Sequence, residues 1–145
     1  MIAAPRAGSD LPGNVSSAFS QKYPAAKLGN WEMYGDDYII TFIDKDVKSS
    51  AYFPPDGAWL RTDTRIESKE DLPAAVRDGL ARSRFAGYDI DKIEKIQQPS
   101  DRTYYIVRVD YGAHLDYDLH DVFVNDYLLY FSSNGTLQET VGHVG

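Results

Sequence analysis

The chain contains no cysteine. This absence excludes disulfide bonds, catalysis by a thiolate, and zinc or iron–sulfur sites with cysteine ligands. Long apolar runs are also missing, because stretches such as DYLLYF at 126–131 are far shorter than the roughly 20 residues that span a bilayer. Residues 1–10 carry no basic start followed by an apolar stretch, so we expect that either the chain is cytosolic or its signal peptide has been removed. We expect no membrane insertion.

Basic residues are the minority among the charged ones. Lys and Arg number 15 against 22 Asp and Glu, which gives a net charge of -7. Such a protein gains nothing from releasing the counterions of a nucleic acid, and an anionic membrane surface repels it. We therefore expect no nucleic-acid partner. The remaining composition is that of an ordinary globular protein, and a chain of 145 residues can bury a core without a metal or a disulfide.

Common catalytic motifs are missing as well. The sequence has neither a Gly-x-Ser-x-Gly elbow nor a phosphate-binding Gly-x-x-x-x-Gly-Lys loop. Carboxylate pairs for glycoside hydrolysis can be drawn from Asp110, Asp116, Asp118 and Asp126, but no spacing fixes the separation that this mechanism needs. We expect a protein that is not an enzyme and that uses no cofactor.

The chain consists of two similar copies of one pattern. The second copy is longer than the first, and its extra residues fall between 110 and 130, where they include GAHLDYDLHDVF. The matching segments are LPGNVSSAF at 11–19 with LPAAVRDGL at 72–80, DYIITF at 37–42 with YYIVRV at 104–109, and FPPDGAWLRT at 53–62 with FSSNGTLQET at 131–140.

Each copy is predicted to begin with a helix. Apolar residues recur at every fourth position, which is the spacing of one helical face. Proline suits the first turn of a helix, and Asp10 and Asp71 are candidate N-caps. The first helix should end near Tyr23, because Pro24 disfavours helical geometry in the residue before it. The apolar positions are Leu11, Val15 and Phe19 in the first copy and Leu72, Val76 and Leu80 in the second.

The remainder of each copy predicts four strands separated by short turns. Short turns imply antiparallel pairing, and two helices cannot cover both faces of a sheet. We therefore predict an α+β fold, an antiparallel sheet with helices packed on one face. One copy alone makes a marginal core, so we expect a single domain over 1–145, built from copies at about 11–65 and 72–141. The predicted strands are WEMY, DYIITFI, VKSSAYF and AWLRT, then KIEKIQ, TYYIVRV, VFVNDYLLYF and TLQET.

Strand alternation assigns side chains to the two faces of the sheet. The face without helices carries tyrosine and arginine, which are enriched in binding interfaces. The alternative is an exposed sheet in which tyrosine only serves strand propensity. The residues expected to face the helices are Tyr38, Ile40, Phe42 and Phe53 in the first copy and Tyr105, Val107, Val109 and Phe131 in the second. Those expected on the opposite face are Tyr104, Ile106 and Arg108 on one strand and Val124, Asp126, Leu128 and Tyr130 on another.

The string HLDYDLH in the extra segment is a candidate metal site. His114, Asp116, Asp118 and His120 alternate with apolar residues, so on one strand they share a face. Histidine and carboxylate bind zinc or manganese, but on a straight strand the two histidines would lie about 20 Å apart. A hairpin would bring them together. A solvated strand or loop tip explains the string better, so we expect no metal.

The structural residues of the repeat resemble those of a known family. The order of motifs is similar to that of the PepSY-like, β-lactamase-inhibitor-protein-like family of secreted domains. The motifs are LPxxV with a following aromatic residue and YP, then Trp31, YIITF, FPPDGAW and a second LPxxV. The resemblance covers nearly the whole chain. It implies a helix-plus-four-strand unit in tandem, export to the periplasm or the cell surface, and no enzymatic activity. The founding inhibitor has disulfides and its inhibitory loop does not align here, so inhibition of a β-lactamase is not implied.

We therefore expect a non-enzymatic, periplasmic or secreted binding module. It should recognise a protein or peptide through the face without helices, with Tyr104, Arg108, Leu128 and Tyr130 as binding residues. Two alternatives stay open. One is an accessory protein that binds a small ligand or a metal through the insertion at 111–124. The other is a structural module whose open face is filled by a copy of itself.

Overall fold

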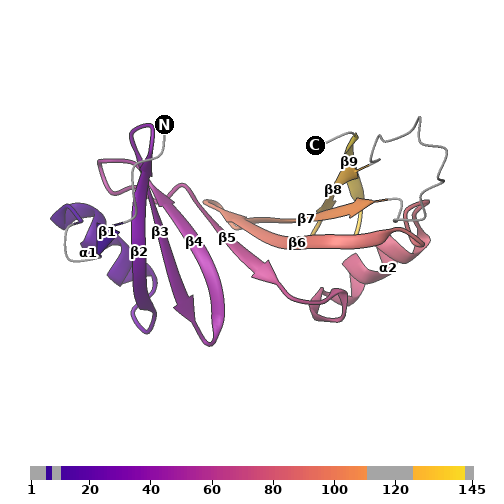
Figure 1. Cartoon of the computed structure of the whole chain (residues 1–145), viewed down its shortest axis with the longest axis horizontal. Helices are drawn as coiled ribbons and strands as arrows, with labels where there is room; N and C mark the ends of the chain where they lie inside the picture. The colour runs from indigo at the N-terminus through magenta and orange to yellow at the C-terminus, as the bar shows by residue number, and fades with distance from the viewer. Residues whose placement is uncertain (1–5, 8–10, 111–125, 143–145) are drawn as a thin grey trace, which may run out of the picture. The chain divides into compact units, whose positions relative to one another are not determined.

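The computed structural model describes residues 6–7, 11–110 and 126–142 (Figure 1). It confirms the predicted α+β class, with two helix-plus-four-strand repeats and antiparallel strands. The elements are β1 (Arg6–Ala7), α1 (Gly13–Lys22), β2 (Lys27–Tyr34), β3 (Asp37–Asp44), β4 (Val47–Phe53), β5 (Arg61–Ile66), the 3-10 helix η2 (Lys69–Asp71), α2 (Ala74–Arg82), β6 (Asp89–Gln98), β7 (Arg102–Asp110), β8 (Asp126–Ser132) and β9 (Leu137–Gly142).

The chain divides into two compact units. The first comprises Met1–Arg65 and Ile96–Arg102, and the second comprises Ile66–Lys95 and Thr103–Gly145. The division after Arg65 falls at the predicted junction between the two copies. That the copies form a single domain stays a prediction.

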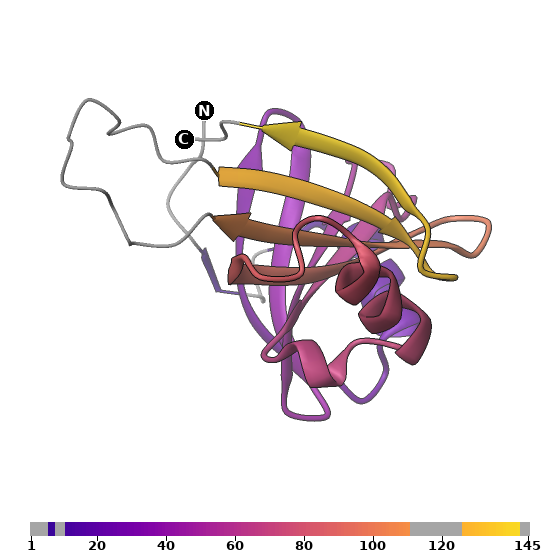
Figure 2. The ribbon, with the colours of Figure 1, turned by 90° about the vertical axis from the view of Figure 1, so that its right-hand side faces the viewer.

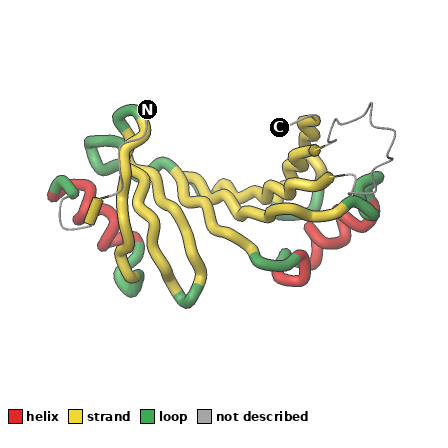
Figure 3. The backbone as a smooth tube through the Cα atoms, viewed as in Figure 1, coloured by secondary structure: helices red, strands yellow, loops and turns green. Residues whose placement is uncertain are grey.

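In the first unit, α1 packs on one face of an antiparallel sheet whose strands follow chain order from β1 to β5 (Figure 3). Val15 and Phe19 on α1 are buried against the sheet, and the ring centroid of Phe19 lies 5.0 Å from that of Phe42. Ile40 and Phe53 complete this core with no exposed surface. The predicted inward face of the first copy is therefore correct.

In the second unit, α2 packs on one face of a sheet in which β7, β8 and β9 are antiparallel neighbours (Figure 2). Val76 and Leu80 on α2 belong to one core with Val107, Leu129 and Phe131. As predicted from the repeat, Phe131 occupies the place that Phe53 has in the first unit, and both are fully buried.

The helix starts differ from the prediction in one respect. Pro12 and Pro73 are the N-cap residues themselves, with nearly identical backbone angles of φ -55°, ψ 146° and φ -55°, ψ 147°, and neither helix has a side-chain cap. The prediction that Asp71 caps the second helix is wrong, because Asp71 lies in η2, where Ser68 is the cap. Asp10 lies outside the described residues.

The predicted strand AWLRT at 58–62 begins too early, because β5 starts only at Arg61. Its first residues continue the turn: the Asp56 carboxylate accepts a hydrogen bond from the backbone N–H of Ala58 over 2.9 Å. The indole N–H of Trp59 then donates to the Thr62 hydroxyl over 2.8 Å, which holds the ring toward the core. Alternation alone does not distinguish this turn from a strand.

Two glycines of the repeat lie where a turn touches the helix of its own unit. Gly57 and Gly135 have φ angles of +85° and +91°, a region that other residues rarely adopt. A Cβ on Gly57 would lie 3.0 Å from the carbonyl oxygen of Asn14, and one on Gly135 would lie 2.1 Å from that of Ala75. Glycine at these two positions therefore allows each turn to lie directly against its helix.

Candidate functional site

The face of the second unit that points away from α2 is here called the open face, and the structure places all the predicted outward residues that it describes there. Arg108 pairs with Leu128 across β7 and β8, and Ile106 pairs with Tyr130. Their chain neighbours Val107 and Leu129 have no exposed surface, so the register assigns the two faces unambiguously. The open face consists of Tyr104, Ile106, Arg108 and Asp110 on β7 and Asp126, Leu128 and Tyr130 on β8.

Tyrosine rings form one end of the open face. The ring centroids of Tyr104 and Tyr130 lie 6.2 Å apart, with their planes tilted by 33°. Both residues are half-buried, as are Ile106 and Leu128 beside them. Rings held in this way offer contact area at a low cost in rotamer entropy.

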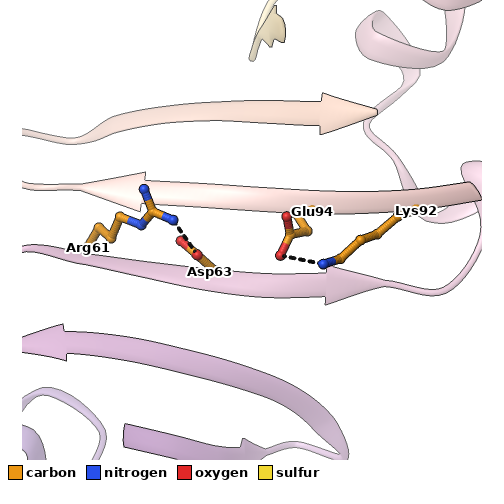
Figure 4. A network of polar contacts seen from close by, with 4 residues as sticks. All are labelled: Arg61, Asp63, Lys92 and Glu94. Atoms are coloured by element: carbon orange, nitrogen blue, oxygen red, sulfur yellow. Dashed lines mark hydrogen bonds and ion pairs between the residues drawn. The ribbon is translucent and has the colours of Figure 1, made fainter. Parts of the chain in front are cut away.

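A charged pair forms the other end. The Arg108 guanidinium donates to the Asp126 carboxylate over 2.9 Å, with 34% of the Arg108 side chain and 13% of the Asp126 side chain exposed. An arginine fixed by a partly buried carboxylate keeps its position without a ligand. Ion pairs elsewhere in the chain include Arg61 with Asp63 at 2.6 Å and Lys92 with Glu94 at 3.6 Å, each between residues two apart on one strand (Figure 4).

Asp126 also belongs to a cluster of three carboxylates. Oxygen atoms of Asp91, Asp110 and Asp126 all lie within 4.8 Å of one another. The pKa of Asp91 is raised to about 6, chiefly by its hydrogen bond to Asp110. Burial and the negative charges of Asp110 and Asp126 raise this pKa further, whereas the positive charge of Arg108 lowers it. Such a cluster either shares a proton or provides the oxygen ligands that a divalent cation prefers.

Asp110 and Asp126 were predicted among possible carboxylate pairs, and Asp126 also on the outward face, whereas Asp91 was not predicted. A partial signal was available in the turn at 99–101, which joins β6 to β7. Equal counts back along β6 and forward along β7 from this turn bring Asp91 opposite Val109, one position from Asp110. The spacing in the sequence gives no hint without that hairpin.

The candidate metal string lies outside the described residues, as does Val124 of the predicted outward set. Its members are His114, Asp116, Asp118 and His120. The expectation that this string binds no metal stays a prediction.

The family model described as "Putative beta-lactamase-inhibitor-like, PepSY-like" matches residues 36–139. The chain belongs to this family. The resemblance read from the LPxxV repeat is thereby confirmed. No curated protein matches the chain.

Solved structures share the fold of this PepSY-like protein. A BLIP-like protein from Bacteroides fragilis is 24% identical, with a TM-score of 0.80 over 93% of this chain and 89% of that one. A DUF2874 family protein from Bacteroides ovatus is 23% identical, with a TM-score of 0.78 over 90% and 86%. A protein from Bacteroides eggerthii, named among "putative periplasmic proteins", is 22% identical, with a TM-score of 0.74 over 90% and 88%.

In the part of the chain that the structure describes, neither α1 nor α2 nor any other helix has the length and apolar character needed to cross a bilayer.

Proposed function

We propose that this PepSY-like protein is an exported, non-enzymatic binding module that recognises a protein or peptide through the open face of its second unit. The observation that carries the proposal is the pairing of Tyr104 with Tyr130 next to the ion pair of Arg108 with Asp126. Tyrosine and arginine are the residue types whose truncation most often costs an interface about 2 kcal/mol or more. The family's inhibitor-like description supports a role in binding rather than in catalysis.

The charge of the open face favours a basic partner. Its arginine lies beside the carboxylates of Asp91, Asp110 and Asp126, so acidic groups outnumber basic ones there. The whole chain is also acidic, with a net charge of -7. Like charges across an interface cost affinity, whereas complementary charges raise the rate of association. The partner should therefore present basic side chains around an apolar contact.

Export is supported by one observation: a structural relative is named among periplasmic proteins. Two alternatives to a separate protein partner remain. One is that the 111–124 insertion binds a small ligand or a metal, and the other is self-association through the open face.

The test is capture of partners from a periplasmic extract by the immobilised chain and by two variants. Tyr104→Ala and Arg108→Ala should each reduce the amount of captured partner at least tenfold, because each truncation should cost the interface about 2 kcal/mol. Arg82→Ala is the matched control, because Arg82 is an exposed arginine at the end of α2 and not on the open face. Capture that is equal for all four proteins would contradict the proposal. Light scattering at several protein concentrations distinguishes self-association from binding of a separate partner, because only self-association raises the molar mass of the purified chain with concentration.

A further inference from the structure

The first unit has a hollow on the face of its sheet that points away from α1. Its volume is about 620 Å³. Across its floor, Ile39 on β3 pairs with Tyr52 on β4, and Tyr52 pairs with Arg61 on β5. On the other side, Ile39 pairs with Glu32 on β2. The hollow therefore runs across four strands and is large enough to receive side chains of a second molecule.

One wall of the hollow combines an exposed ring with two carboxylates. Tyr34 is 57% exposed, the largest fraction among the exposed hydrophobic residues of the described chain. Asp37 is the cross-strand partner of Tyr34, and Glu32 lies two positions before Tyr34 on the same face of β2. A tyrosine ring attracts a cation through its quadrupole, and the adjacent carboxylates add a charge interaction.

The opposite wall shows how this face accommodates a cation. The Arg61 guanidinium carbon lies 4.7 Å from the centroid of the Tyr52 ring, and the guanidinium is held 2.6 Å from the Asp63 carboxylate (Figure 4). Because the charge of Arg61 is balanced by Asp63, the carboxylates of Glu32 and Asp37 leave the hollow negative.

Apolar side chains lie between the two walls. Ile39 is half-buried in the floor, and Leu60 at the rim is 40% exposed. Lysine and arginine carry an aliphatic stem that packs on such surfaces while the charged head stays among polar groups. We propose that this hollow binds a lysine or arginine side chain of a basic protein segment, with the cation over Tyr34 between Glu32 and Asp37. The proposal concerns the first unit and stands independently of the open face.

The test uses the full ¹⁵N-labelled chain and three acetylated, amidated tripeptides: Leu-Lys-Leu, its norleucine analogue and Leu-Glu-Leu. The lysine peptide should shift the amide signals of residues 32–39 and 52–61. Replacement of lysine by norleucine should weaken binding about three- to tenfold, because the apolar stem is kept and the charge is removed. Salt at about 0.5 M should remove most of this difference by screening.

Variants locate the site. Glu32→Gln and Asp37→Asn should each weaken binding of the lysine peptide about two- to fivefold without affecting the norleucine peptide. Tyr34→Ala should weaken both. The matched control is Asp36→Asn, which makes the same charge change one position away from Asp37 but does not line the hollow. Tyr104→Ala, on the open face, should have no effect, so the two proposals fail separately.

Two results would overturn the inference. The first is equal affinity for the three tripeptides, with shifts outside the hollow. The second is tight binding of free spermidine at the hollow with no binding of the lysine peptide, which would assign the site to polyamines. Thermal melts of each variant show that the fold is retained.

Discussion

Gly79 on α2 lies against Gly135 in the turn before β9, so closely that a Cβ on Gly79 would stand 2.1 Å from the carbonyl oxygen of Gly135. The two backbones touch because neither residue has a side chain. In an exposed helix interior, replacing glycine by alanine stabilises by about 1 kcal/mol. At this contact the same replacement should destabilise the protein instead.

We therefore expect Gly79→Ala to lower the free energy of unfolding by about 2 kcal/mol or more, because α2 must move away from the turn. The control is Gly13→Ala at the start of α1, where a Cβ would meet no atom within 4 Å. That variant should be neutral or slightly more stable. Chemical denaturation measures both, and an unchanged Gly79→Ala would show that the helix and the turn are not in close contact.

Adjacent tyrosines on β7 should respond oppositely to truncation. Tyr105 is 6% exposed and belongs to the core, so Tyr105→Ala should cost about 3 to 5 kcal/mol of unfolding free energy. Tyr104 is half-buried on the open face, and Tyr104→Ala should cost about 1 kcal/mol or less. Urea unfolding of the two variants compares them directly. A larger loss for Tyr104→Ala would mean that the two faces are reversed.

The carboxylate cluster should make stability depend on pH. The pKa of Asp91 is raised from 3.8 to about 6, chiefly by its hydrogen bond to Asp110, so the folded protein binds this proton more tightly than the unfolded chain does. The resulting stabilisation is complete below 3.8 and is lost as the pH rises through about 6.

Asp91→Asn keeps a hydrogen-bond donor toward Asp110 and removes one charge. Its stability relative to the natural chain should therefore increase between about pH 4 and pH 8. Denaturation at several pH values measures this difference. Asp89→Asn, two positions earlier on β6, is the control for a general charge effect. A difference between Asp91→Asn and the natural chain that does not change with pH would contradict the shared proton.

Zinc should not stabilise the protein. A site filled at about 100 times its dissociation constant would add about 2.7 kcal/mol to the unfolding free energy, which a thermal melt detects easily. We expect near-stoichiometric zinc to leave the melting temperature unchanged. A zinc-dependent rise that His114→Ala or His120→Ala abolishes would instead place a functional site in the insertion.

The sequence predicts the fold well because it holds two copies of one pattern, so that a residue assigned in one copy can be checked against its equivalent in the other. Phe53 and Phe131 share a turn motif, and both prove to be fully buried. Errors arise where local chemistry has two solutions. An aspartate before Leu-Pro is a reasonable cap, yet in the structure Asp71 lies in η2 and Pro73 is the N-cap of α2, which begins at Ala74.

The sites are less predictable than the fold for a physical reason. Alternation along one strand suffices to assign Tyr104 and Arg108 to a face. The cluster around Asp126 and the hollow beside Tyr34 depend on cross-strand register, which the sequence does not state. Asp91 in particular becomes a neighbour of Asp110 only after the β6–β7 hairpin is known.

The open face is tested most directly by photo-crosslinking in cells. Benzoylphenylalanine placed at Tyr130 should crosslink to a partner, and the same group placed at Asp78, exposed on α2, should not. Arg108→Ala in the same chain should remove the crosslink from position 130. Crosslinks at Asp78 alone, or a crosslink at 130 that persists in Arg108→Ala, would contradict recognition through the open face.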